Sequence, residues 1–128
     1  MKTAFAAFLA ALTLAATANA AEPIGGSFLS AVDTVANKTL IAGSTNTNGL
    51  YLRTIAAECA MNLTVNVVPP GTSAAPRAIV ACSPNSSTIK GAATLPNPLY
   101  VPAGWAVTIN SSAGYQYNLH MTYDLAGQ

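Results

Sequence analysis

Charge is the scarcest property of this 128-residue chain: Asp, Glu, Lys and Arg together make up 7% of it, and the formal net charge is +1. Proteins that bind nucleic acid or anionic membranes carry clusters of Lys and Arg. The sequence contains no such cluster, so it predicts no nucleic-acid partner and, once the N-terminal segment described below is removed, no membrane partner. Solubility must come from neutral polar groups, since Ser, Thr and Asn supply 29 of residues 21–128.

Groups that could carry out catalysis are equally scarce. His120 is the only histidine, and on an extended strand Asp124 would lie about 13 Å from it at about 3.3 Å per residue, too far for a catalytic triad. A glycosidase pair could be drawn only from four carboxylates: Glu22, Asp33, Glu58 and Asp124. The chain has neither a cluster of metal ligands nor a glycine-rich phosphate loop. We therefore predict a protein that is not an enzyme, with no catalytic residue, metal or cofactor.

The first 20 residues have the three parts of a secretory signal peptide, in order. Lys2 is followed by an apolar run from Ala4 to about Ala16, and then by the small-x-small cleavage site Ala18-Asn19-Ala20. The apolar run is shorter than the roughly 20 residues that cross a bilayer. We therefore expect cleavage after Ala20, which leaves residues 21–128 as a single secreted or periplasmic domain.

Cysteine is limited to Cys59 and Cys82. An oxidising compartment favours a disulfide between them, whereas two buried free thiols would be expected if the protein stayed in a cytosol. The bridge would close a loop that contributes on the order of 3 kcal/mol in the chain-entropy model. The two cysteines therefore support the same location as the signal peptide.

Apolar residues alternate with polar ones along most of residues 21–128, which is the period of a β-strand and not of a helix. Segments rich in Pro, Gly and Asn separate the alternating runs. The pattern predicts an all-β fold: a single antiparallel β-sandwich or jelly-roll-like domain of about seven strands. The expected strands lie near residues 28–32, 39–42, 50–57, 61–67, 78–82, 105–109 and 115–124.

Four aromatic residues are the candidates for a binding surface: Trp105, Tyr115, Tyr117 and Tyr123. Exposed aromatic rings beside Asn and Gln suit the binding of sugar rings. The alternative is that these rings fill the core, and it is favoured because the whole chain has only nine aromatic residues. The sequence does not decide which way this stripe faces.

Three further stretches carry a family resemblance: NTNGLYLRT at residues 46–54, PLYVPAG at residues 98–104 and the terminal YDL at residues 123–125. Together they resemble segments of the small β-rich virion accessory and fibre-associated proteins of tailed phages and prophages. The resemblance implies a role in virion assembly or in contact with a host surface, and it transfers no catalytic residue. A virion is thus the alternative location to export, and the signal peptide favours export.

These observations predict an exported, non-enzymatic structural or adhesive β domain that serves as a fibre, surface or virion-type subunit. Its expected partners are further copies of itself, for example in a trimer, or a component of a cell surface. The alternative function is a periplasmic or extracellular module that binds a glycan or small molecule. That function would require a concave aromatic surface outside the core.

Overall fold

The computed structural model describes residues 25–71, 75–84 and 90–127, so the predicted signal peptide, residues 1–20, lies outside the described residues. Within the described ranges the chain forms nine β-strands and no helix. No membrane-crossing helix is found among these residues. The strands are β1 (Ser27–Asp33), β2 (Asn37–Ile41), β3 (Leu50–Cys59), β4 (Leu63–Val68), β5 (Arg77–Cys82), β6 (Gly91–Thr94), β7 (Leu99–Val101), β8 (Ala106–Ser111) and β9 (Tyr117–Leu125).

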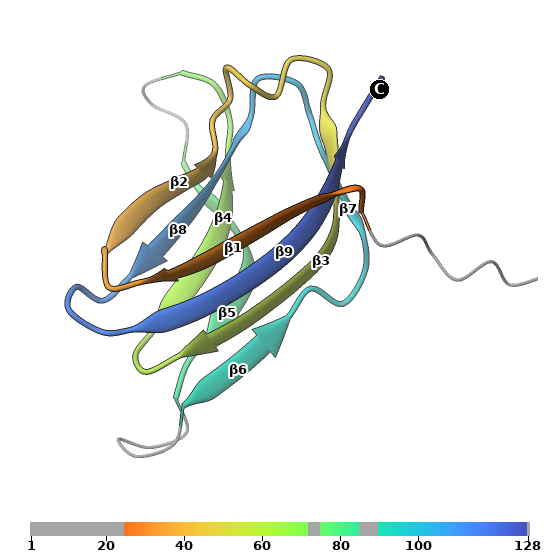
Figure 1. Cartoon of the computed structure of the whole chain (residues 1–128). Helices are drawn as coiled ribbons and strands as arrows, with labels where there is room; N and C mark the ends of the chain where they lie inside the picture. Colours follow the sequence, from red (N-terminus) through yellow and green to blue (C-terminus); the bar gives the residue numbers. More distant parts are fainter. Residues whose placement is uncertain (1–24, 72–74, 85–89, 128) are drawn as a thin grey trace, which may run out of the picture.

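The strands form two antiparallel sheets that pack face to face (Figure 1). Sheet A has the order β1-β9-β3-β6, and β7 also pairs with β3. Sheet B has the order β2-β8-β4-β5. The all-β sandwich predicted from the alternating pattern is therefore confirmed.

The chain is wound as four nested antiparallel pairs: β1 with β9, β2 with β8, β3 with β6, and β4 with β5. The pairs belong in turn to sheet A, sheet B, sheet A and sheet B. This winding brings the first and last strands of the described fold together at one side of sheet A. It leaves β1 as the outermost strand of that sheet.

Alternate side chains of each strand face between the sheets and form one core. In β3, Leu50, Leu52 and Ile55 are buried. A β-bulge between Leu52 and Thr54 inserts one extra residue against β9, so that Arg53 and Thr54 both avoid the core. The bulge therefore places the arginine on the outer face of sheet A, where the site described below is built.

A disulfide joins Cys59, at the end of β3, to Cys82, at the end of β5. Their Cα atoms are 6.2 Å apart, and both residues are buried in the core. Because β3 belongs to sheet A and β5 to sheet B, the bond links the two layers. The disulfide predicted from the sequence is confirmed.

The described fold has nine strands where about seven were expected. Seven of the nine match the expected strands, with bounds that shift by no more than two residues. The two that were not predicted are β6, with the sequence Gly-Ala-Ala-Thr, and the three-residue β7. Neither is long or alternating enough to give a local signal, and both exist because β3 offers them a partner.

Candidate functional site

The four aromatic residues predicted for a binding surface lie in different environments. Tyr117 is buried in the core, because the odd-numbered side chains of β9 face between the sheets there. Tyr115 precedes β9 and is exposed. Trp105 and Tyr123 are partly buried and pack against the margin of the core. The four side chains therefore do not form one exposed surface.

Trp105 lines a shallow depression of about 330 Å³ with mainly apolar neighbours that include Ile79 and Leu99. The guanidinium carbon of Arg77 lies over the Trp105 ring, 5.1 Å from its centroid, which is within cation–π range. The arginine thus covers one face of the Trp105 ring. Trp105 is therefore in contact with another side chain of the same chain, that of Arg77.

An exposed aromatic site that was not predicted lies on the outer face of sheet A. Tyr51 of β3 stands opposite Tyr100 of β7, with ring centroids 5.0 Å apart. Both rings are exposed. The Arg53 guanidinium lies 5.2 Å from the centre of the Tyr51 ring, and its Nε donates to Asp124 Oδ2 at 2.8 Å. We call Tyr51, Arg53, Tyr100 and Asp124 the tyrosine cluster.

Asp124 is the fixed acceptor of the tyrosine cluster. Its Oδ1 accepts a hydrogen bond from the Gly26 backbone N–H at 2.6 Å, and its Oδ2 accepts the one from Arg53. The Gly26 bond first, and then the Arg53 bond, hold the pKa of Asp124 below its usual range. Both carboxylate oxygens are therefore engaged, and the group is ionised at neutral pH. An open depression of about 540 Å³ lies beside Tyr51, Arg53 and Asp124.

The tyrosine cluster draws its members from the three stretches that carry the phage-protein resemblance. Residues 46–54 contain the start of β3, residues 98–104 contain β7, and residues 123–125 end β9. Because β3 pairs with both β7 and β9, the three stretches lie side by side. The exposure of Tyr51 could have been predicted, since it alternates with Leu50 and Leu52. Its pairing with Tyr100 could not.

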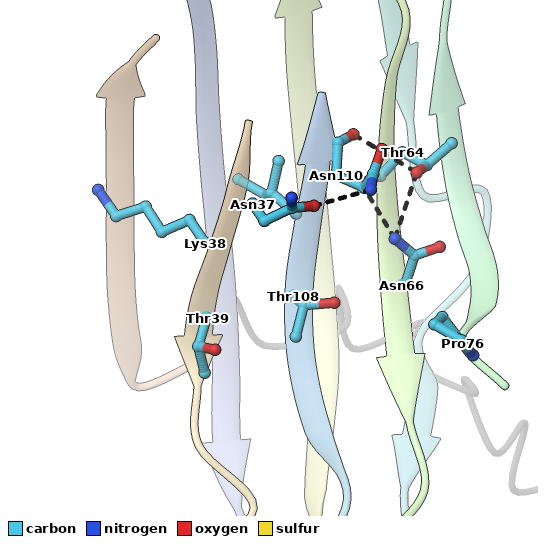
Figure 2. Close-up of a pocket in the computed structure, with 9 residues that line it drawn as sticks. Asn37, Lys38, Thr39, Thr64, Asn66, Pro76, Thr108 and Asn110 are labelled. Atoms are coloured by element: carbon cyan, nitrogen blue, oxygen red, sulfur yellow. Dashed lines mark hydrogen bonds between the residues drawn. The ribbon is translucent and has the colours of Figure 1, made fainter. Parts of the chain in front are cut away.

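The outer face of sheet B carries a different kind of depression, of about 380 Å³, lined by amide and hydroxyl side chains (Figure 2). Asn110 Nδ2 donates to Asn37 Oδ1 at 2.8 Å, and Asn66 Nδ2 donates to Thr64 Oγ1 at 3.2 Å. Lys38 is the one charged residue among those lining it, and Figure 2 shows its side chain directed away from the amides. The lining of this depression is therefore mostly uncharged, and its amides donate to another amide and to Thr64.

Two further titratable side chains of sheet A, those of His120 and Glu58, have local partners. His120 is exposed, and its ring lies nearly parallel to that of Phe28 with centroids 6.0 Å apart. Glu58 lines the same depression of about 410 Å³ as His120 and accepts a hydrogen bond from Asn118 at 3.4 Å. Within residues 25–71, 75–84 and 90–127, no three His, Cys, Asp or Glu side chains are grouped so that they could hold a metal ion.

No protein-family model matches the chain, and no curated protein is significantly similar to it. Its function is therefore inferred from geometry and surface chemistry.

Proposed function

We propose that the chain is an exported, non-enzymatic structural or adhesive subunit that acts through its surface. The observation that carries this proposal is a surface that is poor in charge and yet exposes large apolar side chains. Exposed apolar side chains mark protein contacts where they are contiguous, as Tyr51 and Tyr100 are, and a surface with few charges resists association poorly. The exposed apolar side chains are those of Phe28, Val32, Val35, Tyr51, Met61, Tyr100 and Tyr115.

Several of the few charges are neutralised by one another. Lys38 Nζ lies 2.9 Å from Asp33 Oδ2, and Arg53 Nε lies 2.8 Å from Asp124 Oδ2. Paired charges create only a weak field at a distance, particularly at physiological ionic strength. Copies of this chain can therefore approach one another with little electrostatic repulsion, which supports self-association.

Export is supported by the disulfide between Cys59 and Cys82, because such bonds persist in oxidising compartments. Cleavage of residues 1–20 stays a prediction, and the intact mass of protein isolated from its native source tests it. A chain that begins at Ala21 would agree with export. A chain that begins at Met1 would favour the alternative of a virion protein that is assembled without export.

The nested strand order supports a subunit role by analogy. Four antiparallel pairs that alternate between two sheets make the order of a jelly roll, which occurs in viral capsid proteins and in lectins. Fold alone does not assign function, so this analogy adds to the surface argument without replacing it.

Light scattering coupled to size-exclusion chromatography tests the proposal. Protein expressed from the full chain is expected to form oligomers whose share rises with concentration. A protein that remains monomeric at high concentration would contradict self-association, and it would shift support to the binding module.

A second candidate function, the binding of a glycan or small molecule, is favoured by the tyrosine cluster. Two exposed tyrosine rings next to a fixed ion pair and an open depression offer both apolar faces and hydrogen-bonding groups to a polyol. The test is a glycan array probed with the labelled chain, followed by the same array with Tyr100→Ala. The matched control is Tyr115→Ala, which removes a tyrosine of similar exposure outside the cluster. Binding that is lost in both variants, or in neither, would contradict a site at the cluster.

A further inference from the structure

We propose that two copies of the chain pair along their β1 strands, so that sheet A of one copy continues into sheet A of the other. This inference rests on the proposed function, because it names the surface through which the subunits associate. Three observations support it. One edge of β1 is unpaired in the described fold, nothing along that edge opposes pairing with another strand, and the β1 side chains match those of a second, antiparallel copy of β1.

β1 has an available edge. It pairs with β9 on one side, and no strand of the described fold pairs with its other side. In an antiparallel pair, alternate residues direct their backbone N–H and C=O groups away from the partner strand. Such groups form a template for another strand. A second strand laid against β1 would satisfy them.

The other sheet edges carry devices that oppose strand pairing. In sheet A, β6 and β7 are only four and three residues long. In sheet B, β2 contains Lys38 and its register with β8 shifts after Thr39. The remaining edge strand, β5, begins with Arg77 directly after Pro76, and its register with β4 also shifts. Short strands, basic side chains and bulges are the means by which proteins protect sheet edges.

β1 has none of these devices. Its seven residues pair with β9 in unbroken register, from Ser27 opposite Tyr123 to Asp33 opposite Tyr117. The strand contains no Lys, Arg or Pro. On its outer face, Phe28 is 67% exposed and Val32 is 57% exposed. β1 is therefore the longest of the edge strands of the described fold, its register is unbroken, and it exposes two large apolar side chains.

The side chains of β1 are complementary to a second copy of the same strand. In an antiparallel pairing centred on Ser30, Phe28 of each copy lies opposite Val32 of the other, and Leu29 lies opposite Ala31. Aromatic and β-branched residues form favourable cross-strand pairs. A twofold contact requires a patch that matches itself, and β1 meets this requirement on both of its faces.

The charges of β1 agree with the same register. Asp33 is the only charged residue of the strand, and it would lie opposite Ser27 of the second copy, so the two carboxylates stay apart. Its Oδ2 already accepts a hydrogen bond from Lys38. No pair of like charges is therefore brought together. A twofold contact produces dimers, so it favours even-numbered assemblies over the trimer considered from the sequence.

The experiment places a charge at the centre of the proposed axis. In Ser30→Lys the two introduced ammonium groups face each other, so we expect the dimer dissociation constant to rise by at least about tenfold. The matched control is Thr94→Lys. Thr94 is exposed in the same cross-strand row of sheet A, which runs through Ser30, His120, Ala56 and Thr94, but it lies on the β6 edge. Sedimentation velocity over a concentration series of the full chain gives the dissociation constants.

Mixing tests the register directly. Ser30→Glu alone is also expected to be monomeric, whereas an equal mixture of S30K and S30E should regain the dimer because opposite charges then meet across the axis. Circular dichroism and thermal melting establish that each variant is folded. The pairing would be overturned if Ser30→Lys and Thr94→Lys raised the dimer dissociation constant equally, or if the mixture of S30K and S30E stayed monomeric. Oligomers that persist in S30K would overturn the pairing and leave the proposed function standing, whereas a monomeric native chain would overturn both.

Discussion

Removal of the Cys59–Cys82 disulfide should destabilise the domain by several kcal/mol. The two cysteines are 23 positions apart, so the bond closes a loop of about 24 residues. In the chain-entropy model, release of a loop of about 24 residues returns about 12 cal/mol/K to the unfolded chain, or about 3.4 kcal/mol at 25 °C. At about 4 °C per kcal/mol for a domain of this size, the melting temperature should fall by roughly 10 to 15 °C.

The assay is thermal unfolding, followed by circular dichroism and calorimetry, of Cys59→Ala, Cys82→Ala and the double variant. Either single substitution already breaks the cross-link, so the double variant should lose only slightly more stability than each single one. The small extra loss is expected because both cysteines are buried and each substitution removes a sulfur atom from the core.

Two results would refute this reasoning. Variants that melt within about 2 °C of the native chain would mean that the cross-link contributes little. A double variant that loses twice as much as each single one would mean that packing, and not the cross-link, carries the effect. Far-UV spectra of all three variants at low temperature establish that they are folded.

Further predictions concern buried contacts and charge. Asn46→Ala should lower the free energy of unfolding by about 2 to 4 kcal/mol, because the buried side-chain amide donates to the backbone carbonyls of Pro102 and Trp105 in the loop between β7 and β8. Asn48→Ala, at an exposed position, is the control in the same urea titration. Hydrogen bonds hold the pKa values of Asp33 and Asp124 below their usual range. The ionised carboxylates therefore stabilise the folded state above about pH 4, and this stabilisation is lost as the pH falls through the pKa values of the folded state. The melting temperature should fall between about pH 5 and pH 2, and it should fall less steeply in Asp124→Asn. Gly91→Ala should destabilise the domain by at least about 1 kcal/mol, measured by the same melting assay, since its Cβ would collide with a backbone carbonyl.

The strands that could be predicted are those in which apolar and polar residues alternate along the sequence, because this alternation indicates which side chains are buried. β3 and β9 alternate between core and surface over many residues, so their positions and most of their inward-facing side chains follow from the order of amino acids. The disulfide followed from the presence of only two cysteines together with the predicted export. β6 and β7 carry no comparable pattern, because their backbone pairing with β3 and not their own side chains makes them strands.

The candidate site shows the same division. Tyr51 and Arg53 lie close together in the sequence, and the alternation with Leu50 and Leu52 indicates that Tyr51 faces outward. The β-bulge that directs both Arg53 and Thr54 away from the core arises only when β3 is aligned with β9. The contacts with Tyr100 and Asp124 likewise join residues that are far apart along the chain. Sequence patterns describe one strand at a time, whereas this site is made by three.

The amino-acid sequence by itself determined that this protein is a β domain with little charge, a single histidine and two cysteines available for a bond. These are properties of composition and of short-range alternation, which do not depend on how distant segments meet. Tertiary structure alone decided the register of the strands, and therefore which sheet edge is open and which aromatic rings lie next to one another. The physical reason is that hydrogen bonding between strands is satisfied by any suitably placed backbone, so the partner of each strand is set by the packing of the whole sandwich.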